Sequence, residues 1–145
     1  MSKIALITGA TSGIGKATAE LFAQHGINLI LCGRREERLA SLADILGQKV
    51  NVTTLLFDVR SNQEVMAAFA SLPEEWKAID ILVNNAGNAH GLSSIDTGDV
   101  ADWDAMIDGN VQGLLYVSKQ VIPTMVRRQT GHVVNLSSIA GKQTY

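Results

Sequence analysis

The chain contains little cysteine, little proline and almost no net charge. Cys32 is its only cysteine, which excludes an internal disulfide, and its 2 prolines leave most segments free to form regular structure. The 12 basic and 14 acidic residues nearly cancel and form no broad basic patch, so we do not expect nucleic acid as a partner. The 3 histidines are too far apart for metal-ligand spacing, and we expect no metal.

Long hydrophobic runs are also absent. The first apolar run, residues 4–7, is too short for a signal peptide, and no later run reaches the length of a membrane span. We therefore expect a cytoplasmic protein with no membrane partner. With 145 residues, 46% of them hydrophobic, the chain is long enough to bury a core, and we expect a single domain over residues 1–145.

Short apolar runs alternate with longer amphipathic runs along the chain. The apolar runs predict strands at residues 3–8, 28–32, 52–57, 79–83 and 132–136. The amphipathic runs predict helices at residues 13–25, 36–46, 61–72 and 99–128. Ser61 and Glu64 have the spacing of a capping box at the start of the third helix. The alternation predicts an α/β protein with a doubly wound parallel sheet.

A glycine-rich segment joins the first predicted strand to the first predicted helix. Its three glycines permit a sharp turn and a close approach to a pyrophosphate, and the helix start offers free N–H groups. A P-loop is disfavoured, because its second glycine would fall at Ile14 and Lys16 is followed by Ala17 instead of a hydroxyl residue. The alternative is a tight turn without a ligand. The residues predicted to bind a dinucleotide here are Gly9, Ala10, Thr11, Ser12, Gly13, Ile14 and Gly15.

The residues after the second predicted strand indicate which dinucleotide is bound. An acidic side chain at this place would hold the ribose 2′-hydroxyl and repel a 2′-phosphate. The chain has Gly33 there, followed by Arg34 and Arg35, whose guanidinium groups suit a phosphate. The sequence therefore predicts NADP (NADPH) in preference to NAD. The alternative is that both arginines are solvated and paired with nearby acids such as Glu36 and Glu37.

Four spaced motifs together resemble the N-terminal part of a short-chain dehydrogenase/reductase, over essentially the whole chain. The resemblance implies a Rossmann-like fold with strand order 3-2-1-4-5 followed by further strands, and hydride transfer between a nicotinamide cofactor and a carbonyl or alcohol substrate. Residues 33–39 and 79–87 further resemble the NADP-dependent 3-hydroxy acid dehydrogenases that also oxidise serine. The motifs are the glycine turn at residues 8–15, Asp58-Val59, Asn84-Asn85-Ala86-Gly87 and Asn135-Leu136-Ser137-Ser138, with Asn110 in the long helix.

The resemblance also implies roles for residues around the cofactor. Asp58 would accept a hydrogen bond from the adenine amino group, and the Val59 backbone would approach the adenine ring. Asn85, Ala86 and Gly87 would line the ribose, and this segment would brace the central strands. For Asp58 a simple turn role is the alternative.

Two residues are predicted to act in catalysis. Ser138 follows the fifth predicted strand, where a hydroxyl can hydrogen-bond the substrate oxygen as charge develops on it, and Ser137 is a close rival. The family uses an asparagine at the place of Asn110 to hold a water that links to a catalytic lysine. The alternative is that the Asn110 side chain satisfies backbone groups at an irregularity in the helix. The long helix is predicted to place on its inner face Trp103, Met106, Asn110, Leu114, Val117 and Val121.

One family feature is missing from the printed sequence. Family members complete the site with a Tyr-x-x-x-Lys pair, in which the tyrosine transfers the proton. No such pair occurs here, and Tyr145 lies too close to Ser138 to serve. We therefore expect a Rossmann domain that is C-terminally truncated relative to the family and lacks the last strands and helices. The chain alone is expected to bind a dinucleotide without catalysing turnover. An exposed sheet edge and apolar patch are expected to follow, and the full-length family implies a homo-oligomer.

Overall fold

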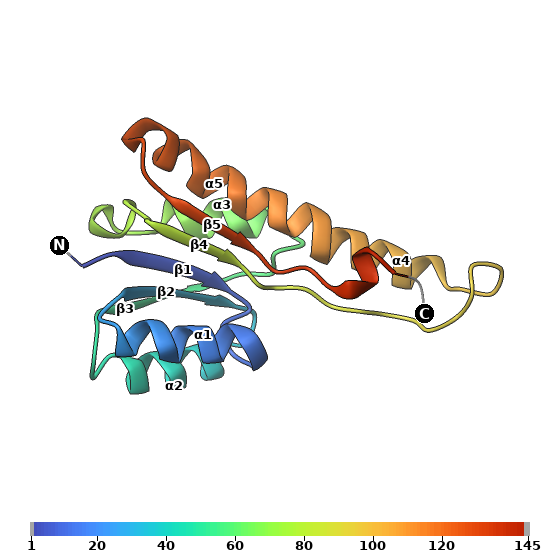
Figure 1. Ribbon diagram of the computed structural model, residues 1–145, viewed down its shortest axis with the longest axis horizontal. Coiled ribbons are helices and arrows are strands. Elements are labelled where there is room, and N and C mark those ends of the chain that lie inside the picture. The colour runs from blue at the N-terminus through green and yellow to red at the C-terminus, as the bar shows by residue number, and fades with distance from the viewer. Residues whose placement is uncertain (1, 144–145) are drawn as a thin grey trace.

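Five parallel strands form the centre of the molecule. The computed structural model describes residues 2–143, so Tyr145 lies outside the described residues (Figure 1). The strands follow the order β3-β2-β1-β4-β5, which confirms the order implied by the family resemblance. In the middle of the sheet, Ile7 of β1 pairs with Leu31 of β2 and with Val83 of β4. The strands are β1 (Ile4–Thr8), β2 (Asn28–Gly33), β3 (Val52–Leu56), β4 (Ile81–Asn84) and β5 (His132–Asn135).

Helices cover both faces of this sheet, and alternate residues of the strands pack against them. Helices α1 (Gly13–Gln24) and α2 (Glu36–Leu46) lie on one face, where Ile7 and Leu31 pack with Leu39 and Leu42 (Figure 1). Helix α3 (Asn62–Ala70) and the long C-terminal helix lie on the other face. There the core includes Leu6, Ile30, Leu55, Val65, Leu82, Val117 and Val121. The predicted doubly wound architecture is therefore confirmed.

The long helix differs most from its prediction. It is continuous but consists of α4 (Val100–Ile107), a π-helical segment (η2, Asp108–Gln112) and α5 (Gly113–Arg128). The extra residue in a π turn changes the phase of the helix, and α4 extends past the ends of the strands (Figure 1). The predicted inner face is therefore wrong in its N-terminal part. Val117 and Val121 are buried as predicted, whereas Asn110 is exposed. The other three residues of the predicted inner face are only half-buried: Trp103, Met106 and Leu114.

The start of α3 also differs from the predicted capping box. Ser61 is the N-cap, and its Oγ accepts a hydrogen bond from the Glu64 N–H at 3.3 Å, as predicted. The Glu64 carboxylate, however, does not return to Ser61. It accepts a hydrogen bond from the Asp58 N–H at 2.8 Å, because the chain turns between β3 and α3. Glu64 therefore anchors the loop that follows β3.

Strand β5 forms one edge of the sheet and is partly exposed. Within residues 2–143, β5 pairs only with β4, and its Val133 and Val134 are 38% and 36% exposed. Three apolar side chains of the long helix, Ile107, Val111 and Leu115, are also about half exposed. The predicted sheet edge and apolar surface are thus present in the described part of the chain, while self-association stays a prediction. Among the described helices, none combines the length and apolarity that crossing a membrane requires.

Candidate cofactor site

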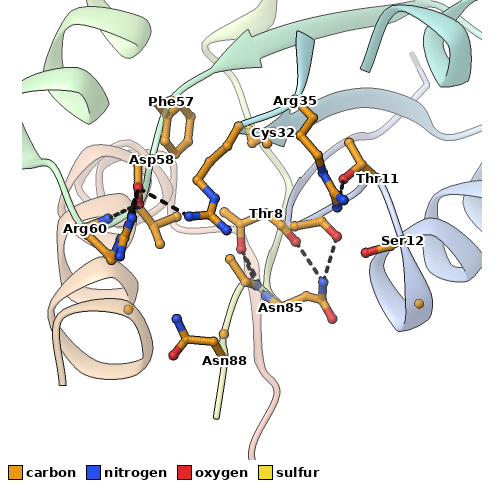
Figure 2. Close-up of a pocket in the computed structure, with 18 of the residues that line it drawn as sticks. Thr8, Thr11, Ser12, Cys32, Arg35, Phe57, Asp58, Arg60, Asn85 and Asn88 are labelled. Atoms are coloured by element: carbon orange, nitrogen blue, oxygen red, sulfur yellow. Dashed lines mark hydrogen bonds and ion pairs between the residues drawn. The ribbon is translucent and has the colours of Figure 1, made fainter. Parts of the chain in front are cut away.

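A cavity of about 450 Å³ lies where the carboxyl ends of β1, β2, β3 and β4 meet (Figure 2). This is the edge at which parallel sheets collect ligands, because the loops after neighbouring strands meet there. All residues predicted to bind the cofactor line it except Ala10 and Gly15. The predicted residues that line it are Gly9, Thr11, Ser12, Gly13, Ile14, Arg34, Arg35, Asp58, Val59, Asn85, Ala86 and Gly87.

The glycine turn forms one wall of the cavity, and its glycines are required for different reasons. Gly9 has φ +62° and packs so closely that a Cβ would lie 2.9 Å from Asn85 Nδ2 and 3.1 Å from Ala86 Cα. Gly13 also has a positive φ, +53°, but a Cβ there would meet nothing within 4 Å. Gly15 lies behind the turn, where a Cβ would collide with the carbonyl of Gly9. The turn is thus pressed against the loop after β4 and open at Gly13.

The N-terminus of α1 points its free N–H groups toward this turn. Ser12 is the N-cap in an extended conformation, and its side chain makes no capping hydrogen bond. The first turn of α1 contains no acidic residue. The partial positive charge of the helix start is therefore not compensated by a side chain of the helix, which suits an anion such as a pyrophosphate. Ala10 is fully buried and donates its N–H to the Cys32 carbonyl at 3.1 Å, so it supports the turn from behind.

A hydrogen-bonded pair joins the ends of the two central strands. Thr8 Oγ1 accepts hydrogen bonds from the N–H groups of Asn85 and Ala86, at 3.0 and 2.9 Å. In return, Asn85 Nδ2 donates to the carbonyls of Thr8 and Gly9, at 3.0 and 3.1 Å (Figure 2). The predicted bracing of the central strands is therefore present. Because β1 and β4 are held together here, the glycine turn and the loop after β4 form one rigid corner of the cavity.

The two predicted arginines lie on the cavity wall and contact other wall residues. Arg35 Nη2 donates to Thr11 Oγ1 at 3.0 Å, and Arg34 Nη1 lies 3.6 Å from Asp58 Oδ2. Within the described chain, neither is paired with Glu36 or Glu37. The alternative of pairing with these glutamates is thus not what the structure shows. Both cations face a region that has Gly33 where an acid would select against a phosphate.

Sequence reasoning missed Arg60, which is a wall residue bonded to Asp58. Arg60 Nη2 donates to Asp58 Oδ2 at 2.6 Å, and its Nε lies 3.1 and 3.0 Å from the two carboxylate oxygens. The hydrogen bond from Arg60 is the main reason that the pKa of Asp58 is lowered. The Arg60 N–H also donates to Asp58 Oδ1 at 3.0 Å, so the predicted alternative of a turn role is present as well. The signal in the sequence was an opposite charge two positions after Asp58.

Asn110 is committed to the loop after β4. Its Oδ1 accepts the N–H of Asn88 at 2.8 Å, and its Nδ2 donates to the carbonyl of Asn88 at 2.7 Å. It lies in the π-helical segment, so the predicted helix irregularity exists, but the amide bonds the loop and not the helix. Asn110 does not line the cavity, whereas Gly109 beside it does.

Ser138 is also outside the cavity wall. Its Oγ accepts the N–H of Ala140 at 3.2 Å and so caps a short 3₁₀ turn (η3, Ile139–Gly141). The structure therefore does not bring the predicted catalytic serine together with the predicted cofactor residues, and the roles of Ser138 and Ser137 stay predictions. Within residues 2–143, no three His, Cys, Asp or Glu side chains gather closely enough to hold a metal ion.

Several wall residues carried no functional signal in the sequence. Cys32 is buried at the end of β2, and burial raises the pKa of its thiol, so it is an unreactive part of the wall. The π-helical segment and α5 approach the cavity through glycines, since a Cβ at Gly113 would lie 2.8 Å from Val59 Cβ. The remaining wall residues without such a signal are Phe57, Asn88 and Gly109.

Comparison with known proteins identifies similar chains. Residues 3–145 match the family model described as short chain dehydrogenase. The chain is 46% identical over 142 residues to the NADP-dependent 3-hydroxy acid dehydrogenase YdfG of Salmonella typhi, covering 98% of this chain and 56% of that protein. It is 48% identical over 146 residues to sulfoacetaldehyde reductase 2 of Chromohalobacter salexigens, covering 100% of this chain and 58% of that protein.

A solved structure agrees with these matches. The closed form of serine dehydrogenase complexed with NADP⁺ is 46% identical to this chain and superposes with a TM-score of 0.90. That match covers 98% of this chain and 56% of the serine dehydrogenase chain. The chain therefore spans little more than half the length of the relatives it matches.

Proposed function

The chain belongs to the short-chain dehydrogenase family, and from this premise we propose that it is the NADP(H)-binding part of an oxidoreductase. The reaction proposed is hydride transfer between nicotinamide and a carbonyl or alcohol substrate. The observation that carries the proposal is the cavity itself, which joins an uncompensated helix N-terminus to two arginines and has no acid after β2. A bound nicotinamide cofactor would supply or accept the hydride.

The residues of the cavity suit the parts of such a cofactor. We propose that the glycine turn and the start of α1 hold the pyrophosphate, and that Arg34 and Arg35 bind the 2′-phosphate. The Asp58 carboxylate is proposed to accept a hydrogen bond from the adenine amino group, and the Val59 backbone is proposed to approach the adenine ring. The residues proposed to line the ribose are Asn85, Ala86 and Gly87. The NADP⁺ complex of the similar serine dehydrogenase supports the choice of NADP over NAD.

The substrate class proposed is a 3-hydroxy acid. It is supported by the resemblance of residues 33–39 and 79–87 and by the name of the Salmonella typhi relative. Sulfoacetaldehyde reductase 2 has a similar sequence identity to this chain but is named for another substrate, so the names of the relatives alone do not determine the substrate class. Ser138 is proposed to hydrogen-bond the substrate oxygen and Asn110 to hold a water. The proposal for Ser138 requires the η3 turn to place its hydroxyl at the cavity.

A second candidate function is dinucleotide binding without turnover by this chain alone. It is favoured by the absence of a Tyr-x-x-x-Lys pair from the printed sequence and by the use of the Ser138 hydroxyl as a helix cap. An assay of NADPH oxidation with small keto acids distinguishes the two. Turnover by the purified 145-residue chain would contradict the binding-only candidate.

The first experiment is a fluorescence titration of the chain with NADPH and, separately, with NADH. Because Arg34 and Arg35 are proposed to bind the 2′-phosphate, we expect NADPH to bind about tenfold or more tighter than NADH. Arg34→Gln is expected to remove most of this preference. Lys77→Gln is the control and should leave the preference unchanged, because Lys77 lies at the end of the short η1 segment (Glu74–Trp76) and pairs with the exposed Glu74. Equal affinity for both cofactors contradicts the proposed phosphate site. No binding of either contradicts the proposed function.

A further inference from the structure

We propose that Arg60 is the residue that sets specificity for adenine, by positioning the Asp58 carboxylate so that one of its oxygens stays available for the adenine amino group. The inference rests on the proposed function, in which Asp58 faces the adenine. Arg60 does not touch the base in this proposal. It acts through Asp58 and is therefore a positioning residue.

The Asp58 residue is held at both its backbone and its side chain. Its N–H donates to Glu64 Oε2 at 2.8 Å, which ties the backbone to the first turn of α3. Its Oδ1 accepts the Arg60 N–H at 3.0 Å, and the Arg60 guanidinium binds the carboxylate through Nε and Nη2. Two independent anchors therefore determine the direction in which the carboxylate faces.

The hydrogen bonds also determine which acceptor positions are left. An ionised carboxylate has about four lone-pair positions on its two oxygens. Arg60 N–H and Nε approach Oδ1, and Nε and Nη2 approach Oδ2. The only other cation recorded near it in the described chain is Arg34, whose Nη1 is 3.6 Å from Oδ2, beyond a good hydrogen bond. The single Nε–H is shared between the two oxygens, so three hydrogens occupy about four acceptor positions. The Asp58 carboxylate, which lines the cavity, thus keeps one acceptor position.

This arrangement separates the tasks of the two arginines. Arg34 is 63% exposed and makes one long contact with Asp58, so it can turn to a 2′-phosphate at little cost. Arg60 is bound through three atoms, lies on the side of Asp58 toward the long helix and is also attracted by Asp108 (Figure 2). Arg60 therefore keeps Asp58 charged and in place when Arg34 leaves it.

The test compares three ligands: NADPH, NADH and the hypoxanthine analogue of NADPH, which has a carbonyl in place of the adenine amino group. The readout is the dissociation constant of each from fluorescence titration, with the far-UV circular dichroism spectrum as a check of folding. The variants are Arg60→Gln and Arg60→Lys. Lysine keeps the charge but cannot bind both oxygens as a planar guanidinium does.

We expect the unaltered chain to prefer NADPH over the hypoxanthine analogue by about tenfold, the effect of one hydrogen bond to a charged acceptor. Arg60→Gln should reduce this ratio to less than about threefold, and Arg60→Lys should fall between the two. The ratio of NADPH to NADH affinity should stay unchanged in both variants. Arg34→Gln is expected to have the opposite pattern.

The control is Arg127→Gln, which removes a guanidinium that donates to Thr124 Oγ1 near the far end of α5. Neither ratio should change in it. An unchanged preference for adenine in both Arg60 variants overturns the inference while leaving the proposed function intact. Loss of the NADPH-over-NADH preference in Arg60→Gln would instead assign Arg60 to the phosphate and also overturn it. Failure of the unaltered chain to bind NADPH overturns both the inference and the proposed function.

Discussion

At the scale of single residues, the cavity depends on close contacts between two loops that are distant in the chain. Thr8 and Asn85 exchange hydrogen bonds across 77 positions, and Gly9 lies against the Asn85 side chain. Thr8 is almost completely buried, so its hydroxyl is needed to satisfy the N–H groups of Asn85 and Ala86. Substitutions at this corner of the cavity are therefore expected to disturb its packing or its hydrogen bonds.

Two glycines of the same turn provide a matched comparison. Gly9→Ala combines a positive φ with a Cβ 3.1 Å from the Ala86 backbone, and we expect it to lower the free energy of unfolding by about 2–3 kcal/mol. Gly13→Ala has a positive φ but open space, so about 1 kcal/mol is expected. Urea unfolding followed by circular dichroism measures both. Equal losses would show that crowding at Gly9 has no energetic effect.

At the scale of elements, the end of α5 shows how a helix stops without glycine. Gln129 has φ +52° in the left-handed region, and its N–H donates to Val126 O at 3.1 Å. The N–H of Thr130 donates to Met125 O at 3.2 Å. These two bonds form a Schellman motif, in which glycine is the usual residue at the left-handed position. The chain reverses here to enter β5, so the strained position is required by the path of the backbone.

Gln129→Gly is expected to stabilise the protein. Glycine adopts the left-handed conformation without the cost of a Cβ, and part of that gain is offset by its greater freedom in the unfolded chain. The net increase in the free energy of unfolding should be about 0.5–1 kcal/mol. Gln129→Ala is the control, since alanine keeps a Cβ and should leave stability nearly unchanged. A thermal melt that places both variants at the same midpoint would contradict the expectation.

At the scale of the whole molecule, Asp80 connects three segments at the end of the sheet opposite the cavity. Its carboxylate accepts the Ile4 N–H at 2.9 Å and binds Arg128 Nη2 at 2.6 Å, so it joins the starts of β1 and β4 to the last residue of α5. Burial raises the pKa of Asp80, but the hydrogen bonds from Ile4 and Arg128 outweigh it and hold this pKa below its usual value. Asp80 therefore stabilises the fold only while it is ionised.

The sign of this effect predicts a pH dependence. Stabilisation by Asp80 is fully present above its unfolded-state pKa of about 3.9 and is lost as the pH falls through its lower folded-state pKa. Asp80→Asn should thus lower the free energy of unfolding by about 1 kcal/mol at pH 7, and by less as the solution becomes acidic. Urea unfolding across the acidic range measures the difference. Glu74→Gln, which breaks the exposed pair with Lys77, is the control and should have no measurable effect.

Local chemistry alone determined much of this protein. The apolar runs indicated all five strands, because burial selects apolar side chains wherever a strand lies between two layers of helices. The glycine turn was predictable because positive φ angles at Gly9 and Gly13 favour a residue without a Cβ. Ser61 was predictable as a cap because its partner, Glu64, is three positions away. The strand order came from the family resemblance, which local pattern could not supply.

The tertiary structure alone decided how distant residues meet. The phase of the long helix depends on a π-helical segment where Asn110 bonds Asn88, 22 positions away, and the sequence-based helical phase could not anticipate it. Glu64 bonds the backbone N–H of Asp58 instead of Ser61, because the chain turns sharply after β3. Residue types and local spacing are encoded along the chain, whereas these contacts depend on the direction in which each loop leaves the sheet. For that reason the cofactor class could be predicted from the sequence, and the positioning of Asp58 could not.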